Sequence, residues 1–272
     1  MIPALGVHPT SGLPLSVSWA PAHFERGAEM ATVDEIAPDI FRIGLGAMPG
    51  DPITTSFFLI RDEQPTLVET GYRKTFDDAW DAVGRLLDPT TVRYVVVPHL
   101  EGDESGALNH FLERAPNAQA VGSPIGAAVN LSDFAVREPL AVDDSTAFDL
   151  GSHRLRFLIT PYVHQWDSML AYDDTTRTVF CSDVFISLGE GPAVTDRDES
   201  DAMLDAYRMI GIFPSKRHLD SALDKIEATD PMTLACHHGS VKGGRGVHGY
   251  LRAMRENDVT GLTEWNPMAE VR

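Results

Sequence analysis

The most informative segment of the chain reads Val92-Arg-Tyr-Val-Val-Val-Pro98-His99-Leu-Glu-Gly-Asp-Glu-Ser-Gly106. Its first part is a nearly continuous apolar run, which is the pattern of a strand covered on both faces. Its second part is a polar loop that begins directly after the strand, at the carboxyl end where α/β proteins build their sites. The segment therefore predicts a buried sheet covered by helices, with a candidate site where the strand ends.

Strand and helix patterns continue on both sides of this segment. In the first half we expect strands at 39–44, 55–60, 65–70 and 119–121, and helices at 75–87 and 105–114. The second half repeats the theme, with strands expected at 153–160, 168–172, 177–181 and 232–235, and helices at 199–211, 217–228 and 246–256. Two similar halves of this kind favour an α/β (α+β) fold in which two sheets are sandwiched between helices.

The length allows one large domain. With 272 residues and 43% hydrophobic content, the chain is long enough for a single sizeable core and too short for two. Residues 1–35 contain several prolines and no sustained period, which predicts an irregular N-terminal extension. Residues 36–272 are then expected to form the single domain.

The charge balance narrows the class of partner. Lys and Arg number 22 against 40 Asp and Glu, which gives a net charge of -18. Such an acidic chain repels nucleic acid and anionic lipid, so we expect a small molecule or a protein as partner. The chain has only two cysteines and no pair with CxxC spacing, which excludes a Cys₄ zinc site and a disulfide framework. Because no long apolar run or secretory start occurs, we expect a cytoplasmic protein with no membrane segment.

Polar residues with metal-ligating side chains follow several predicted strands. The first loop holds His99, Glu101, Asp103 and Glu104. Taken alone, such a loop is as readily a solvated acidic cap of the next helix. His164, Asp183 and the pair His237-His238, however, also stand just past predicted strands. Four strand ends that each deliver imidazole or carboxylate together predict a metal site.

These motifs resemble a known family. The loop has the pattern His99-x-Glu101-x-Asp103-Glu104-x-Gly106, which is similar to the HxExDHxG motif of flavodiiron proteins and oxygen-binding di-iron proteins. The wider metallo-β-lactamase-fold hydrolases carry HxHxDH there. Residues 161–172, 180–185 and 238–239 resemble later motifs of the same branch, so the resemblance covers roughly residues 36–240. It implies a four-layer αββα metallo-β-lactamase-like sandwich.

The resemblance also implies a ligand set. By position it implies one iron held by His99, Glu101 and His164, a second held by Asp103 and His238, and Asp183 bridging the two. Glu104 departs from the family, because it stands where the motif has its last histidine. Three roles are open for Glu104: it ligates the second metal, it holds a water molecule there, or it leaves a coordination position of that metal vacant. His237 is an alternative to His238 as the terminal ligand.

The donor types favour iron over zinc. Zinc prefers nitrogen and sulfur ligands in tetrahedral arrays, whereas mixed imidazole and carboxylate sets suit iron or manganese. With Glu104 coordinated, four carboxylates would balance the four positive charges of two divalent ions. We therefore expect two iron ions, with manganese or zinc as alternatives. No flavodoxin-like phosphate loop occurs in the sequence, so no FMN is expected in this chain.

Other side chains near His164 have open roles. Tyr162, Trp166 and Tyr172 are candidates to line the pocket, and Tyr162 and Trp166 also to take part in catalysis, although core packing is the favoured interpretation of such aromatics. Asp167 is a candidate to orient a ligating imidazole or to cap a strand.

The function implied is that of a non-haem di-iron oxidoreductase. It would bind dioxygen and activate or reduce it, with electrons from an external reductase or a small-molecule substrate. A non-catalytic di-iron oxygen sensor and a dinuclear zinc hydrolase with a metal-bound hydroxide remain as alternatives. A homodimer is compatible with the sequence.

Overall fold

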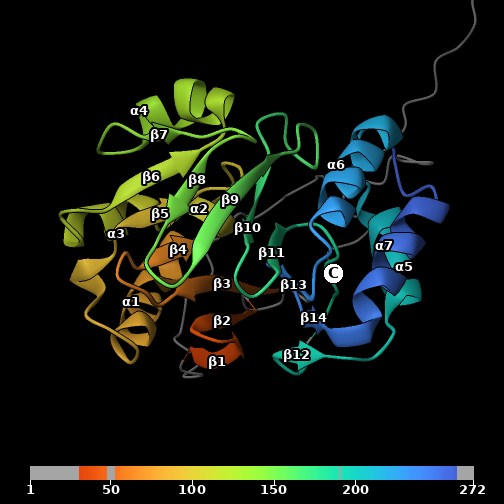
Figure 1. The fold of residues 1–272 in the computed structure, drawn as a ribbon, viewed down its shortest axis with the longest axis horizontal. Helices are drawn as coiled ribbons and strands as arrows, with labels where there is room; N and C mark the ends of the chain where they lie inside the picture. Colours follow the sequence, from red (N-terminus) through yellow and green to blue (C-terminus); the bar gives the residue numbers. More distant parts are fainter. Residues whose placement is uncertain (1–30, 48–52, 190, 262–272) are drawn as a thin grey trace, which may run out of the picture.

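Two seven-stranded sheets pack face to face between two sets of helices (Figure 1). The computed structural model describes residues 31–47, 53–189 and 191–261. The first sheet runs in the order β1 (Thr32–Ala37), β2 (Ile40–Ala47), β3 (Thr54–Ile60), β4 (Thr66–Val68), β5 (Tyr94–Val96), β6 (Gln119–Gly122) and β7 (Leu140–Ala141). The second runs in the order β12 (Val194–Thr195), β14 (Val241–Gly243), β13 (Thr233–Cys236), β11 (Thr178–Ser182), β10 (Met169–Asp173), β9 (Arg154–Ile159) and β8 (Ala147–Asp149).

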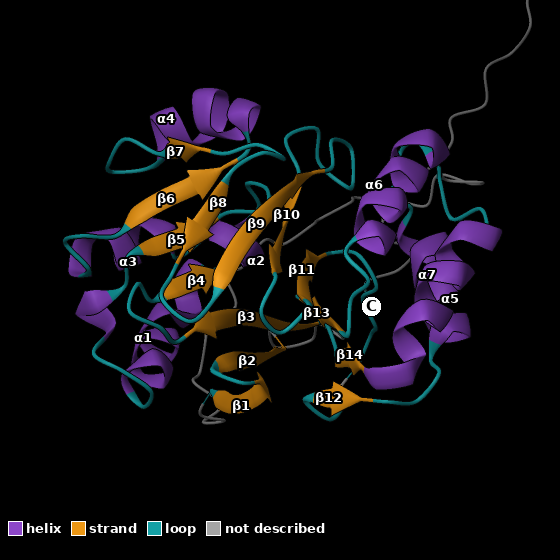
Figure 2. Ribbon diagram, viewed as in Figure 1, coloured by secondary structure: helices purple, strands orange, loops and turns teal. Residues whose placement is uncertain are grey.

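Helices cover the outer face of each sheet (Figure 2). On the first sheet these are α1 (Phe76–Gly84) and α3 (Leu108–Arg114), with the short helices α2 (Gly102–Ser105) and α4 (Ser132–Phe134) and a π-helical segment at Gly126–Leu131. On the second sheet these are α5 (Ser200–Ile210), α6 (Lys216–Ala228) and α7 (Val247–Glu256). Short 3₁₀ turns lie at Arg73–Thr75, Pro89–Thr91 and Gly244–Gly246. No helix among the described residues is long and apolar enough to cross a bilayer.

The alternation of apolar side chains along the strands produces three separate cores. In β3, Phe57 and Leu59 belong to the cluster beneath α1 and α3, whereas Phe58 and Ile60 face the cluster between the two sheets. A third cluster lies between the second sheet and helices α5, α6 and α7. Because side chains of a strand alternate between faces, a strand that is apolar at every position must be covered on both sides. The three cores confirm the predicted αββα layering.

The predicted long elements are confirmed, with differences at the edges. The strand β1 begins at Thr32, inside the predicted irregular extension 1–35, whereas residues 1–30 lie outside the described residues. The edge strands β7, β8 and β12, and β14 next to β12, have only two or three residues each, which is too few for a visible period. The helix expected at 105–114 begins later, as α3 at Leu108, and the short helix α2 lies before it in the expected polar loop.

The strand directions bring distant parts of the chain to one edge of the sandwich. Strands β4, β5 and β6 are parallel neighbours in the first sheet, and β11 and β13 are parallel neighbours in the second. Parallel neighbours end at the same edge, so the loops that follow them meet there. Most of the polar residues singled out from the sequence lie on the loops after β5, β11 and β13. His164 follows β9, which is antiparallel to β10 and therefore runs in the same direction as β11.

Candidate metal centre

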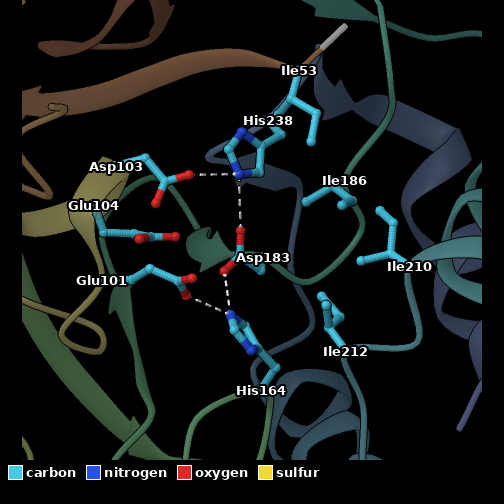
Figure 3. Close-up of a pocket in the computed structure, with 10 residues that line it drawn as sticks. All are labelled: Ile53, Glu101, Asp103, Glu104, His164, Asp183, Ile186, Ile210, Ile212 and His238. Atoms are coloured by element: carbon cyan, nitrogen blue, oxygen red, sulfur yellow. Dashed lines mark ion pairs between the residues drawn. The ribbon is translucent and has the colours of Figure 1, made fainter. Parts of the chain in front are cut away.

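Four strand-end loops converge on one cavity (Figure 3). The loop after β5 supplies His99, Glu101, Asp103 and Glu104; the loop after β9 supplies His164; Asp183 follows β11; His237 and His238 follow β13. In Figure 3, Asp183 stands at the centre, with His238 on one side of it and His164 on the other. The side chains form two groups of possible ligands, each with its donor atoms within 4.8 Å of one another.

The first half-site comprises His99, Glu101 and His164. The Nε2 atom of His164 lies 3.1 Å from Glu101 Oε2 and 3.0 Å from Asp183 Oδ2. The Nε2 atom of His99 lies 3.3 Å from the same Glu101 oxygen and 3.4 Å from the same Asp183 oxygen. Two imidazole nitrogens and two carboxylate oxygens thus face one point, which is the donor set of a mixed nitrogen and oxygen metal site.

The second half-site comprises Asp103, Glu104 and His238. The Nε2 atom of His238 lies 3.4 Å from Asp103 Oδ2 and 3.3 Å from Asp183 Oδ1. The other ring nitrogen, Nδ1, donates to the carbonyl oxygen of Thr54 at 2.9 Å, so the lone pair that is free for a metal is on Nε2. Asp183 therefore turns one oxygen to each half-site, as a bridging carboxylate does.

Glu104 is buried between the two half-sites. Its side chain is 1% exposed, and its Oε1 lies 3.5 Å from His99 Nε2. Its Oε2 is buried without a hydrogen-bond partner. Burial, and then the charges of Asp183 and Asp103, raise the pKa of Glu104 well above its usual value. The side chain therefore does not point outward as a helix-capping residue would, and it leaves an unsatisfied oxygen where a cation would fit.

The imidazoles are polarised by the carboxylates around them. Burial lowers the pKa of His164, but the hydrogen bonds to Asp183 and Glu101 outweigh it and raise the pKa to about 9. For His238, burial is likewise outweighed by Asp103 and Asp183, which raise the pKa to about 10. Burial alone would raise the pKa of Asp183, yet His164 and His238 hold it well below the usual value. Without a metal the cluster thus binds protons in place of cations, and the residues fit a two-metal centre.

The wall opposite the ligands is apolar. Figure 3 shows isoleucine side chains facing Asp183 across a cavity of about 160 Å³. These are Ile53, Ile186, Ile210 and Ile212. A small cavity with charged donors on one side and hydrocarbon on the other suits a small ligand of low polarity.

Two motif glycines are explained by close packing. A Cβ atom on Gly106, after the first ligand loop, would come within 2.2 Å of the carbonyl oxygen of Gly102. Gly239, after His238, has a φ of +76°, and a Cβ there would meet the carbonyl oxygen of Ser187 at 2.5 Å. Both positions therefore require glycine if the neighbouring ligands are to keep their places.

The aromatic candidates lie outside the cavity wall. Tyr162 and Trp166 are 44% and 41% exposed, so they are not core residues. The ring centroid of Tyr162 lies 4.8 Å from that of His218, and neither aromatic lines the cavity. Asp167 does not hold an imidazole; its Oδ2 accepts a hydrogen bond from Asn130 Nδ2 at 2.6 Å. Tyr172 is buried in β10.

Glu69 is a residue of the site that was not predicted from the sequence. This buried carboxylate follows β4 directly, and its Oε2 lies 2.8 Å from Nδ1 of His237. The strand was expected to span residues 65–70, which places Glu69 inside it, whereas β4 ends at Val68 and Glu69 follows the strand directly. Only with the strand end known does Glu69 show the same signal as the other residues, which is an acidic side chain just past a strand.

Comparison with known proteins places the fold and the family. The chain is 32% identical over 197 residues to putative diflavin flavoprotein A 1 of Nostoc sp., which covers 68% of this chain and 33% of the relative. It is 26% identical over 199 residues to the flavo-diiron protein FprA2 of Clostridium acetobutylicum, covering 70% of this chain and 50% of the relative. The chain thus spans a third to a half of the length of these relatives.

Solved structures share the architecture. Rubredoxin oxygen:oxidoreductase from Desulfovibrio gigas superposes with a TM-score of 0.76 at 20% identity, covering 83% of this chain and 61% of that one. The metal-soaked flavodiiron core from Synechocystis sp. gives 0.72 at 22% identity, covering 83% and 60%. Residues 53–239 match the family described as ODP family beta lactamase, which is more than half of the chain. The chain therefore belongs to the ODP family of beta-lactamase-fold proteins, and relatives with similar sequences are named flavodiiron and diflavin proteins.

Proposed function

We propose that the chain is the di-iron core of an oxidoreductase that binds and reduces dioxygen with electrons from a separate donor. The observation that carries the proposal is Asp183, whose two oxygens face the imidazoles of two different half-sites at 3.0 Å and 3.3 Å. One carboxylate placed in this way serves two metals that act together on one small ligand. A single isolated metal would not need it.

The ligand set fits iron. His99, Glu101 and His164 would hold one ion, and Asp103, Glu104 and His238 the other, with Asp183 shared. Two irons, when bound, supply a place for dioxygen and the electrons that reduce it. The mixed imidazole and carboxylate donors support iron or manganese over zinc.

The protein side chains prepare the cavity for this reaction. The four isoleucines exclude water from the side that faces the donors, so a small molecule of low polarity enters at little desolvation cost. Burial, and then the charges of Asp183 and Asp103, raise the pKa of Glu104 well above its usual value, so a bound cation is needed to stabilise its charged form.

The electron donor is proposed from the relatives. The name of rubredoxin oxygen:oxidoreductase states that this protein transfers electrons from rubredoxin to oxygen. By analogy we propose a small redox protein or a flavin carrier as the donor for this chain. The oxygen sensor remains the main alternative, because the same cavity would bind dioxygen without turnover.

Oxygen consumption tests the proposal. Metal-free protein is loaded with Fe²⁺ without air, a chemical reductant and a flavin mediator are added, and dioxygen uptake is followed with an electrode. Many turnovers per chain are expected, and Asp183→Ala should reduce them to the background. Uptake of a single equivalent would support the sensor. Hydrolysis of an ester or phosphodiester by the zinc-loaded protein, with no oxygen uptake by the iron-loaded one, would contradict the proposal.

A further inference from the structure

One imidazole beside the second half-site is not accounted for by the ligand set above. His237 is fully buried, and its Nε2 has no hydrogen-bond partner. That nitrogen lies 4.0 Å from Asp103 Oδ2 and belongs to the same group of possible ligands as Asp103, Glu104 and His238. A buried polar atom without a partner is costly, and this one faces a set of metal-binding donors.

The backbone of His237 is fixed on both sides. Its N–H donates to the carbonyl oxygen of Ser182 at 3.0 Å. Its own carbonyl oxygen accepts from Ser56, from the N–H at 3.0 Å and from Oγ at 2.9 Å. These bonds hold the main chain at His237 in place, and the contact of its ring with Glu69 then directs Nε2 toward the second half-site.

Glu69 determines which nitrogen of His237 is free. Its Oε2 lies 2.8 Å from Nδ1, and both side chains are at most 1% exposed. A carboxylate only accepts hydrogen bonds, so the ring proton is placed on Nδ1 and the lone pair on Nε2. Carboxylate, imidazole and metal in this order form a frequent arrangement around histidine ligands.

The two half-sites become alike once His237 is included. The first has one fully buried imidazole, His99, and one that lines the cavity, His164. The second then has His237 buried and His238 at the cavity wall. We propose that His237 is a ligand of the second metal, supplying the imidazole that the loop lacks at Glu104, and that Glu69 is its positioning residue. This inference rests on the proposed two-metal function.

The test is an equilibrium titration of metal-free protein with Fe²⁺ in the absence of air, against a competing chelator. Wild type should bind two equivalents. His237→Ala should bind the second at least about 100-fold more weakly and the first unchanged, because a lost ligand costs more than a lost outer partner. Glu69→Gln, which keeps the shape and an acceptor oxygen, should weaken the second step by about 10–100-fold.

A matched control separates ligation from folding. His153 is also a buried histidine beside a buried carboxylate, with Nδ1 3.2 Å from Asp173 Oδ1, but it precedes β9 at the strand end opposite to His164. His153→Ala should leave both binding steps unchanged. On a His164→Ala background, where the first step is already weakened, adding His237→Ala should remove the remaining one. Far-UV circular dichroism checks that each variant folds, and His237→Gln replaces His237→Ala if the latter does not.

The outcomes are distinct from those for the function. If His237→Ala, His237→Gln and Glu69→Gln all bind the second Fe²⁺ as tightly as wild type, the inference is overturned, even if the wild type reduces dioxygen. A loss confined to the second step supports it, even if no dioxygen is consumed. Equal weakening of both steps also overturns it, because that marks a purely structural role. Wild type that fails to bind two equivalents overturns both proposals.

Discussion

The two half-sites use the same residue types but differ in how the side chains are paired. In the first, Glu101 is 44% exposed and lies against two imidazoles, at 3.1 Å and 3.3 Å. In the second, Glu104 is 1% exposed and keeps one oxygen without a partner. The first half-site thus has internal partners before a metal arrives, whereas the second leaves buried atoms unsatisfied. The comparison teaches that the departure from the family motif lies where the protein is least complete without a metal.

Asp183 is shared by the two half-sites, so its removal should weaken metal binding at both of them. We expect Asp183→Ala to reduce bound iron from two to fewer than about 0.5 per chain, because a bridging carboxylate ligates both ions and screens their repulsion. Elemental analysis after desalting measures this. His164→Ala should instead lower mainly the first equivalent. If Asp183→Ala and His164→Ala lost the first and second iron in the same proportions, Asp183 would not bridge the two metals.

Acid should weaken both half-sites through their cavity-lining histidines. With pKa values of about 9 for His164 and about 10 for His238, both are protonated in the metal-free protein at pH 7. Metal binding must displace these protons, so roughly two are released per chain and the overall affinity rises about 100-fold per pH unit below pH 9. Calorimetry in two buffers of different ionisation enthalpy counts them. No proton release between pH 7 and 8 would contradict the assignment of these ligands.

Restoring the family residue should make the second half-site more like that of the relatives. Glu104→His removes a negative charge, so the reduced irons are favoured, and we expect the reduction potential to rise by roughly 60 mV, a tenfold change in the one-electron equilibrium. Both metals should be retained. Potentiometry compares this variant with Glu104→Gln, which also removes the charge but adds no imidazole. An unchanged potential in both variants would place Glu104 outside the metal shells.

The smallest effect on the metal centre is expected from the exposed aromatic side chains. Trp166 was a candidate catalytic residue, but it is 41% exposed and does not line the cavity. Trp166→Ala removes a ring that is more than half buried, so the unfolding free energy should fall by about 1–2 kcal/mol. Metal content and dioxygen uptake should stay unchanged. A several-fold loss of uptake at full metal content would instead restore Trp166, and by extension Tyr162, as a functional residue.

The sequence was sufficient to predict the layers and most of the converging loops. Long apolar runs such as β3 and β5 have a clear period, and polar residues after strands mark a common edge. It was not sufficient for features that depend on packing between distant segments. The exposure of Tyr162 and Trp166, the Asn130 partner of Asp167 and the burial of Glu69 all depend on which loops meet in space.

The site also lies on the seam between the two sheets. The carbonyl oxygen of Thr54 in β3 accepts a hydrogen bond from His238, and Ser56 in the same strand donates to His237. Ions bound here would be coordinated by residues 99–104 from the first half of the chain and by residues between 164 and 238 from the second half, and would so link the two halves. Metal binding would therefore stabilise the folded protein. An ion present at 100 times its dissociation constant raises the free energy of unfolding by about 2.7 kcal/mol. With metal bound, the two halves of the sandwich would unfold together in one cooperative transition. Without metal, the transition would occur at a lower temperature.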